Sequence, residues 1–177
     1  MRRTGTRRLV FLALLVALGT ALHVAESLLA LPLPIPGVKL GLANIVTLLA
    51  IYLYGFREGL TVALMRVLLA SLIGGFVLSP SFLLGISGAV ISTLVMAILL
   101  RYTRCFTAIG ISMAGAVGHN IGQLLAAWLL LQSVSIFFYL PILLLAGVPS
   151  GLFTGYVLKY LLEQSENSGV LSGSEWR

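Results

Sequence analysis

Apolar residues along the chain fall into six long stretches, separated by short breaks that are polar or contain proline. The stretches run over about 9–30, 40–54, 59–78, 82–100, 107–131 and 137–162. Most approach the roughly 20 residues that a helix needs to cross a bilayer core about 30 Å thick. We therefore expect residues 1–162 to form one all-α integral membrane domain with six transmembrane helices.

The overall composition agrees with a membrane protein. Of the 177 residues, 59% are hydrophobic and 9% are charged, and the mean hydropathy is +1.10. This leaves too little polar surface to cover a soluble globule of this size. After Leu162 the chain turns polar, and we expect residues 163–177 to form a disordered tail.

The basic residues predict a topology, because cytoplasmic loops carry the excess of Lys and Arg. With six helices and both the N and C termini in the cytoplasm, the two outer loops at 79–81 and 132–135 carry no basic residue. The residues that fall on the cytoplasmic side are Arg2, Arg3, Arg7, Arg8, Arg57, Arg101, Arg104 and Lys159. Lys39 is the one exception. A signal peptide is the alternative for the N-terminus. However, the first apolar stretch is longer than the 7–15 apolar residues that are usual in a signal peptide.

Lys39 follows a segment that cannot begin as a helix, because prolines stand at positions 32, 34 and 36. Five residues later comes Asn44, so a cation and an amide enter the next apolar stretch, where polar groups are costly. Lys39 either snorkels to lipid headgroups or helps to bind an anion. On the second interpretation, residues 32–44 form the lid and anion-binding corner of an outward-facing cavity.

The first apolar stretch has two different faces. At about 100° per residue, Gly19, His23 and Glu26 share a polar face, and polar residues in a bilayer usually face protein or water. A stripe of small residues lies roughly opposite, at Ala13, Ala17, Ala21 and Ala25. Small residues permit close helix contact, so this stripe either packs within the chain or docks on another membrane protein.

Arg66 lies inside the third stretch, where an arginine costs at least about 2.5–3.5 kcal/mol on insertion scales. We therefore expect it to have a partner or a function. An ion pair with Glu26, the only acidic residue within a predicted span, is one alternative. An anionic ligand is the other.

The fifth stretch places polar groups together at His119, Asn120 and Gln123. Interior hydrogen bonds between helices are one explanation for these residues, for His23 and for Asn44. The other is a shared cavity open to the outside. In that case its substrate-binding residues are Lys39, Asn44, Arg66, His119, Asn120, Gln123, His23 and Glu26. Two cations with amide and imidazole donors favour an anion, and the surrounding aliphatic residues favour an apolar body.

Several classes of function are disfavoured by the sequence. There is no phosphate-binding loop of the P-loop type and no aspartate, and magnesium sites generally need carboxylates. The single Cys105 excludes a disulfide framework or a Cys-rich metal site. The basic residues do not form a patch with interleaved aromatics, which disfavours nucleic acid. We therefore predict no catalytic residue, metal or cofactor.

Three segments resemble the family labelled heptaprenyl diphosphate synthase component I, also called the Gx transporter family. They are residues 36–44, Arg66 with the later pair Gly74 and Gly75, and residues 115–123, within a resemblance over about 9–162. That family is similar to the S components of energy-coupling factor (ECF) transporters. The resemblance implies an ECF S-component-like bundle in the cytoplasmic membrane of a prokaryote, with its cavity under the first loop. It also implies that the alanine stripe docks on a transmembrane coupling subunit driven by two cytosolic ATPases.

On this resemblance, the leading hypothesis is a subunit that captures a small amphipathic anion, such as an isoprenoid or quinone precursor, for uptake. The alternative is a non-catalytic membrane accessory subunit of a polyprenyl diphosphate synthase, which presents a lipid substrate to a soluble partner. A self-contained secondary carrier is less well supported, since six helices show no clear inverted repeat.

Overall fold

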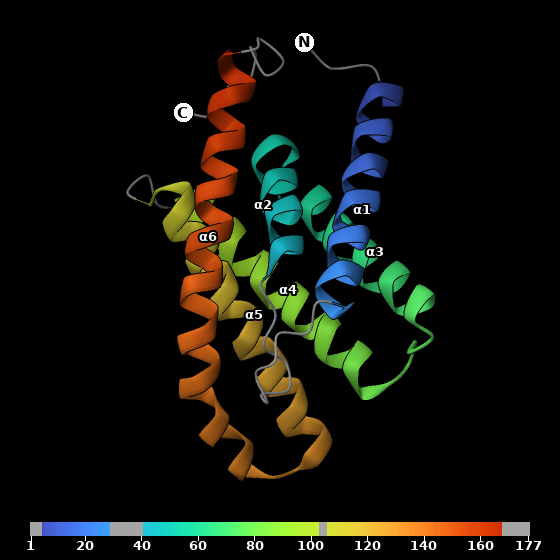
Figure 1. Ribbon diagram of the computed structural model, residues 1–177, viewed down its shortest axis with the longest axis vertical. Helices are drawn as coiled ribbons and strands as arrows, with labels where there is room; N and C mark the ends of the chain where they lie inside the picture. Colours follow the sequence, from blue (N-terminus) through green and yellow to red (C-terminus); the bar gives the residue numbers. More distant parts are fainter. Residues whose placement is uncertain (1–4, 29–40, 103–105, 168–177) are drawn as a thin grey trace.

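The computed structural model describes residues 5–28, 41–102 and 106–167, and this part of the chain is all-α (Figure 1). Lys39 lies outside the described residues. The elements in chain order are α1 Gly5–Leu28, α2 Leu42–Tyr54, α3 Phe56–Gly74, α4 Pro80–Tyr102, α5 Ala108–Leu131, the 3-10 helix η1 Val134–Tyr139 and α6 Leu140–Asn167. The expected all-α fold is confirmed.

Four segments are long and apolar enough to cross a membrane. They are Gly5–Ser27, Pro80–Tyr102, Ala108–Leu131 and Val134–Gln164. The helix α2 has only 13 residues, and α3 carries Arg57, Glu58 and Arg66 within its 19 residues. A multi-pass membrane protein is therefore supported, while the count of six spans remains a prediction.

Several helix boundaries differ from the sequence prediction by a few residues. The helix α3 ends at Gly74 and not at residue 78, because Gly75 adopts the left-handed conformation at φ 71° and caps the helix. Leu78 is also left-handed, at φ 65°, so the chain turns through these residues before α4. At the other end of the chain, α6 continues to Asn167, beyond the expected boundary at Leu162.

The short helix α2 occupies the middle of the bundle (Figure 1). On one side it contacts α1 and α3, which also pack on each other. On the other side it contacts α4, α5 and α6, and α5 packs between α4 and α6. Eight of its 13 residues are buried, from Ala43 to Ile51. A helix that is buried on nearly all sides has to be apolar all round, and this explains its sequence LANIVTLLAIYLY.

Glycines let α5 approach its two neighbours closely. A Cβ on Gly122 of α5 would lie 2.7 Å from the carbonyl oxygen of Ser87 in α4, and a Cβ on Gly151 of α6 would lie 2.5 Å from Cα of Met113 in α5. Real Cβ atoms do not approach backbone atoms so closely. These contacts are typical of helix packing in membranes, where small residues permit close approach of backbones.

The two faces of α1 have opposite environments. His23 and Glu26 are buried, whereas Ala13, Ala17 and Ala21 are exposed and Ala25 is half-buried. Packing of the alanine stripe inside the described chain is therefore excluded for the first three alanines. The polar face of the helix points into the protein, as the sequence indicated.

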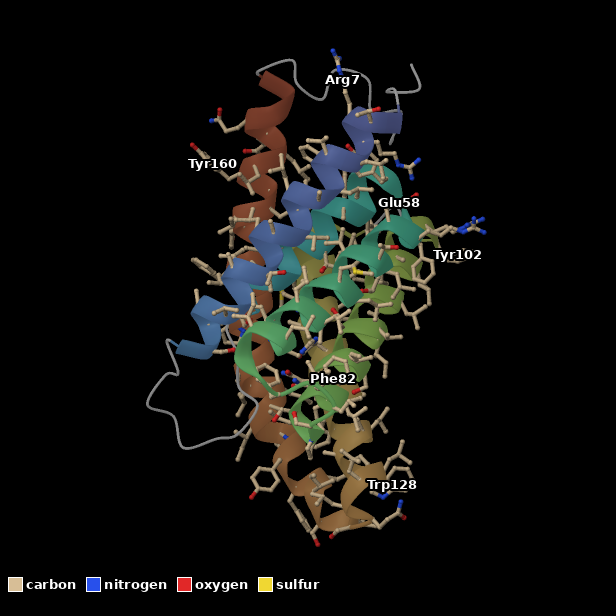
Figure 2. All side chains as sticks on the ribbon, turned by 90° about the vertical axis from the view of Figure 1, so that its right-hand side faces the viewer. Arg7, Glu58, Phe82, Tyr102, Trp128 and Tyr160 are labelled. Atoms are coloured by element: carbon tan, nitrogen blue, oxygen red, sulfur yellow. The ribbon has the colours of Figure 1, made fainter. Side chains whose placement is uncertain are left out.

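Several charged and aromatic side chains lie near the two ends of the bundle. In Figure 2, Arg7, Glu58, Tyr102 and Tyr160 lie toward the end where α1 begins, and Trp128 lies toward the opposite end. Arg8 forms an ion pair with Glu58 at the same end as α1 begins. Such clustering fits interfacial residues at two membrane surfaces. Which end faces the cytoplasm remains a prediction.

We predict that Gly151→Ala destabilises the bundle, because the added Cβ forces α6 away from the backbone of Met113. Overpacking of this kind costs about 1–3 kcal/mol in the free energy of unfolding. Thermal unfolding in detergent measures the effect. Gly5→Ala is the matched control, since its Cβ meets no atom within 4 Å. Equal melting temperatures for the two variants would contradict the packing argument.

Candidate functional site

A small polar cavity lies inside the bundle where α2 begins. Its volume of about 30 Å³ is enough for about two water molecules. Residues from α1, α2, α3, α5 and α6 contribute to its wall. The lining residues are His23, Glu26, Gly41, Ala43, Asn44, Arg66, Ala116, His119, Asn120, Gly147 and Ser150.

Arg66 is the cation of the polar cavity, and only 2% of its surface is exposed. Its Nη2 donates a hydrogen bond of 2.8 Å to Oδ1 of Asn44, and its Nη1 lies 3.5 Å from Nδ1 of His23. A guanidinium can only donate, so in this long contact Nδ1 of His23 faces Arg66 as an acceptor. Arg66 Nε has no hydrogen-bond partner among the described residues.

Glycines make room for the polar side chains of this cavity. A Cβ on Gly19 of α1 would lie 3.3 Å from Cδ of Arg66, and a Cβ on Gly147 of α6 would lie 2.6 Å from Nδ2 of Asn120. Larger residues at these two positions would press on the side chains of the site. Glycine at these positions of α1 and α6 therefore leaves space for the side chains of Arg66 and Asn120 in a tightly packed interior.

Glu26 connects the end of α1 to the start of α2. Its Oε1 accepts a hydrogen bond of 2.6 Å from the backbone N–H of Leu42, the first residue of α2. The N-terminal N–H groups of a helix lack partners within the helix and carry partial positive charge, so a carboxylate is favoured there. The negative charge of Glu26 also attracts the Arg66 guanidinium. The acid thus serves the helix start and stabilises the buried cation.

Asn120 bridges α5 and α6. Its Nδ2 donates a hydrogen bond of 2.7 Å to the carbonyl oxygen of Leu143. Further along the same interface, the hydroxyls of Ser112 and Thr154 bond to each other at 2.7 Å. The interhelical contact that the sequence left open for Asn120 is therefore present, and its side chain lines the polar cavity as well.

A second cavity, which we call the large cavity, has a volume of about 680 Å³. His23 and His119 line both cavities. The large cavity is bounded by His23, Ser27, Val67, Ser71, Phe76, Ser81, Leu84, Gly85, His119, Gln123, Leu124, Ala127, Leu131, Ile136, Tyr139 and Leu143. Its size lies within the range of about 300–1,000 Å³ that is usual for small-molecule sites.

The structure brings most of the predicted site residues together. Those that line the polar cavity are His23, Glu26, Asn44, Arg66, His119 and Asn120. Gln123 lines the large cavity and not the polar one. Lys39 lies outside the described residues.

Sequence reasoning missed the contribution of α6 to the polar cavity. Ser150 and Gly147 both line it, and the hydroxyl oxygen of Ser150 lies 2.9 Å from the place of a Cβ on Gly41. A signal existed, because Gly147, Gly151 and Gly155 recur every fourth residue and so mark the face that packs closely on a neighbour.

Comparison with known proteins gives one match. The family model described as heptaprenyl diphosphate synthase component I matches residues 15–161. No curated protein matches the chain, and no solved structure matches it.

We predict that Asn44→Leu lowers the free energy of unfolding by about 1.5–3 kcal/mol, because it removes the acceptor from a buried charged donor. Chemical denaturation in detergent measures this loss. Thr47→Val is the matched control on the same helix, since Thr47 is buried and its hydroxyl has no hydrogen-bond partner among the described residues. Its stability should equal or exceed that of the wild type. A larger loss for Thr47→Val than for Asn44→Leu would refute this account of Arg66.

Proposed function

The chain belongs to the heptaprenyl diphosphate synthase component I family, and on this premise we propose that it is a non-catalytic membrane subunit that binds an amphipathic anion. The single observation that carries the proposal is the buried Arg66 at the polar cavity. The whole sequence contains no aspartate. Because magnesium-dependent chemistry on diphosphates needs carboxylate ligands, catalysis is left to a partner.

The cost of burying Arg66 supports a functional role. An arginine at the centre of a membrane helix costs at least about 2.5–3.5 kcal/mol on insertion scales, and a neutral residue there would avoid that cost. One of its donors, Nε, has no hydrogen-bond partner among the described residues. Guanidinium binds phosphate and carboxylate through paired hydrogen bonds. The head of the ligand is therefore an anion of this kind.

An incoming anion competes with Asn44 for the guanidinium. The polar cavity has room for only about two water molecules at 30 Å³, so a diphosphate or carboxylate head has to open the Arg66–Asn44 bond. The exchange replaces a neutral acceptor by a charged one, which can accept two parallel hydrogen bonds from the guanidinium. Lys39 remains a proposed second cation, outside the described residues.

The family description favours a first role, as the membrane component that holds a prenyl diphosphate for a soluble catalytic partner. The exposed alanines of α1 favour a second role, as the binding subunit of an ATP-driven uptake system. In that role the stripe packs on a transmembrane coupling subunit with two cytosolic ATPases, the cavity opens outward and both termini lie in the cytoplasm of a prokaryote. Both roles use the same anion site.

We predict that Arg66→Met weakens binding of geranyl diphosphate by about 10- to 100-fold, the equivalent of one charged hydrogen bond of about 1.5–3 kcal/mol. Titration calorimetry of the purified protein measures the affinity. Arg57→Met is the control, because Arg57 is an exposed cation on the same helix; its affinity should change less than twofold. Equal affinities of wild type and Arg66→Met would remove the anion site.

We further predict that Ala17→Leu combined with Ala21→Leu prevents assembly with the partner but leaves geranyl diphosphate binding intact, because both alanines are exposed and away from the cavities. Co-purification from the native membrane measures assembly. Leu145→Trp is the control, since it enlarges a residue of α6 that is 76% exposed. Partners that include ATPases support uptake, and a soluble synthase rich in aspartate supports the first role. Unchanged assembly in the double variant would exclude the stripe as the docking surface.

A further inference from the structure

We propose that the large cavity holds the apolar tail of the same ligand over about 14 chain carbons. This inference rests on the proposed function and extends it from the head of the ligand to its body. It assigns a second subsite, between α1, α3, α4, α5, η1 and the start of α6, to a linear hydrocarbon chain.

The chemistry of the wall suits a hydrocarbon. Aliphatic and aromatic side chains such as Leu84, Leu124 and Ile136 make up much of it. Two of its serines use their hydroxyls inside their own helices: Ser27 donates to the carbonyl oxygen of His23, and Ser71 to that of Val67. Their donors are thus already engaged with backbone. A tail that needs no hydrogen bonds fits such a wall.

The volumes of the two cavities also suit a small head group and a larger tail. The polar cavity, at about 30 Å³, takes little more than the contact atoms of a head group, whereas the large cavity offers about 680 Å³. A ligand held by Arg66 must therefore place most of its volume in the large cavity. The two cavities share His23 and His119 as wall residues, and these two imidazoles mark the boundary between head and tail.

Gly88 of α4 fixes the position of this boundary. A Cβ at Gly88 would lie 2.8 Å from Cε1 and 2.9 Å from Nε2 of His119, and 2.9 Å from Cγ of Gln123. The His119 ring thus packs directly on the α4 backbone. Gln123, one turn further along α5, is the first residue on the tail side that does not line the polar cavity.

The length of the large cavity follows from α5, which forms one side of it. His119 and Leu131 both line the cavity and stand 12 residues apart, which is roughly 18 Å along a helix axis. An extended carbon chain advances about 1.25 Å per bond of about 1.5 Å, so the cavity accepts about 14 chain carbons. Leu131 is 66% exposed, and a longer tail would leave the protein there.

The test compares two single-tailed probes, butyl phosphate and tetradecyl phosphate, with the full-length protein in phosphatidylcholine nanodiscs and with empty nanodiscs subtracted. Ala127→Trp places an indole in the large cavity, eight residues beyond His119 on α5. We expect this variant to bind tetradecyl phosphate at least tenfold more weakly than the wild type, and butyl phosphate less than twofold more weakly. An equal change for both probes would overturn the tail subsite. Ala127→Leu, with a smaller side chain, repeats the comparison if the Trp variant does not fold.

Two further arms separate the possible causes. Leu125→Trp is the matched control on α5, because Leu125 is exposed and does not line the large cavity; both probes should bind it as they bind the wild type. Arg66→Met should weaken the binding of both probes by the same factor. Unchanged binding of both probes in this variant would count against the proposed function and not against the tail subsite.

Discussion

The structure depends on holding one positive charge inside an apolar bundle. Arg66 is nearly fully buried, and its surroundings come from distant parts of the chain. Oδ1 of Asn44 accepts a hydrogen bond from its guanidinium, and the Glu26 carboxylate attracts it. Gly19 leaves space for its side chain. Because each of these contacts stabilises a charge that a membrane interior disfavours, α1, α2 and α3 have to meet at this point, and the polar cavity forms where they meet.

Local sequence predicted the helices well, since apolar periodicity and polar breaks act within a few residues. Gly75 shows where this fails: its left-handed cap ends α3 early, and apolar residues such as Val77 beyond it looked like more helix. Arg66, Asn44 and His119 were predictable as residues that line an interior cavity, because each is a polar group in an apolar run. Ser150 was not, because a serine in a helix is common, and only the packing of α6 on α5 brings it to the cavity. The large cavity depends on how η1 and five helices enclose space, which no local pattern encodes.

The lack of aspartate and the two faces of α1 bear on the family description. On the proposed function, a chain without aspartate contributes binding and leaves magnesium chemistry to a partner. Its helix α1 presents polar groups to the interior and a row of small residues to the outside. The proposal therefore assigns the interior to a small molecule and the outer face of α1 to a large partner, and the identity of that partner distinguishes the two proposed roles.

The hydrogen bond from Leu42 N–H to Glu26 has a mechanical consequence. It fastens α1, which presents the exposed alanines, to the first turn of α2, which supplies the acceptor for Arg66. An anion that approaches Arg66 brings negative charge toward the Glu26 carboxylate, and like charges at short range repel. On the proposed function, an anion in the polar cavity therefore repels the same carboxylate that joins α1 to α2. Glu26 would in this way couple the occupancy of the cavity to the position of α1.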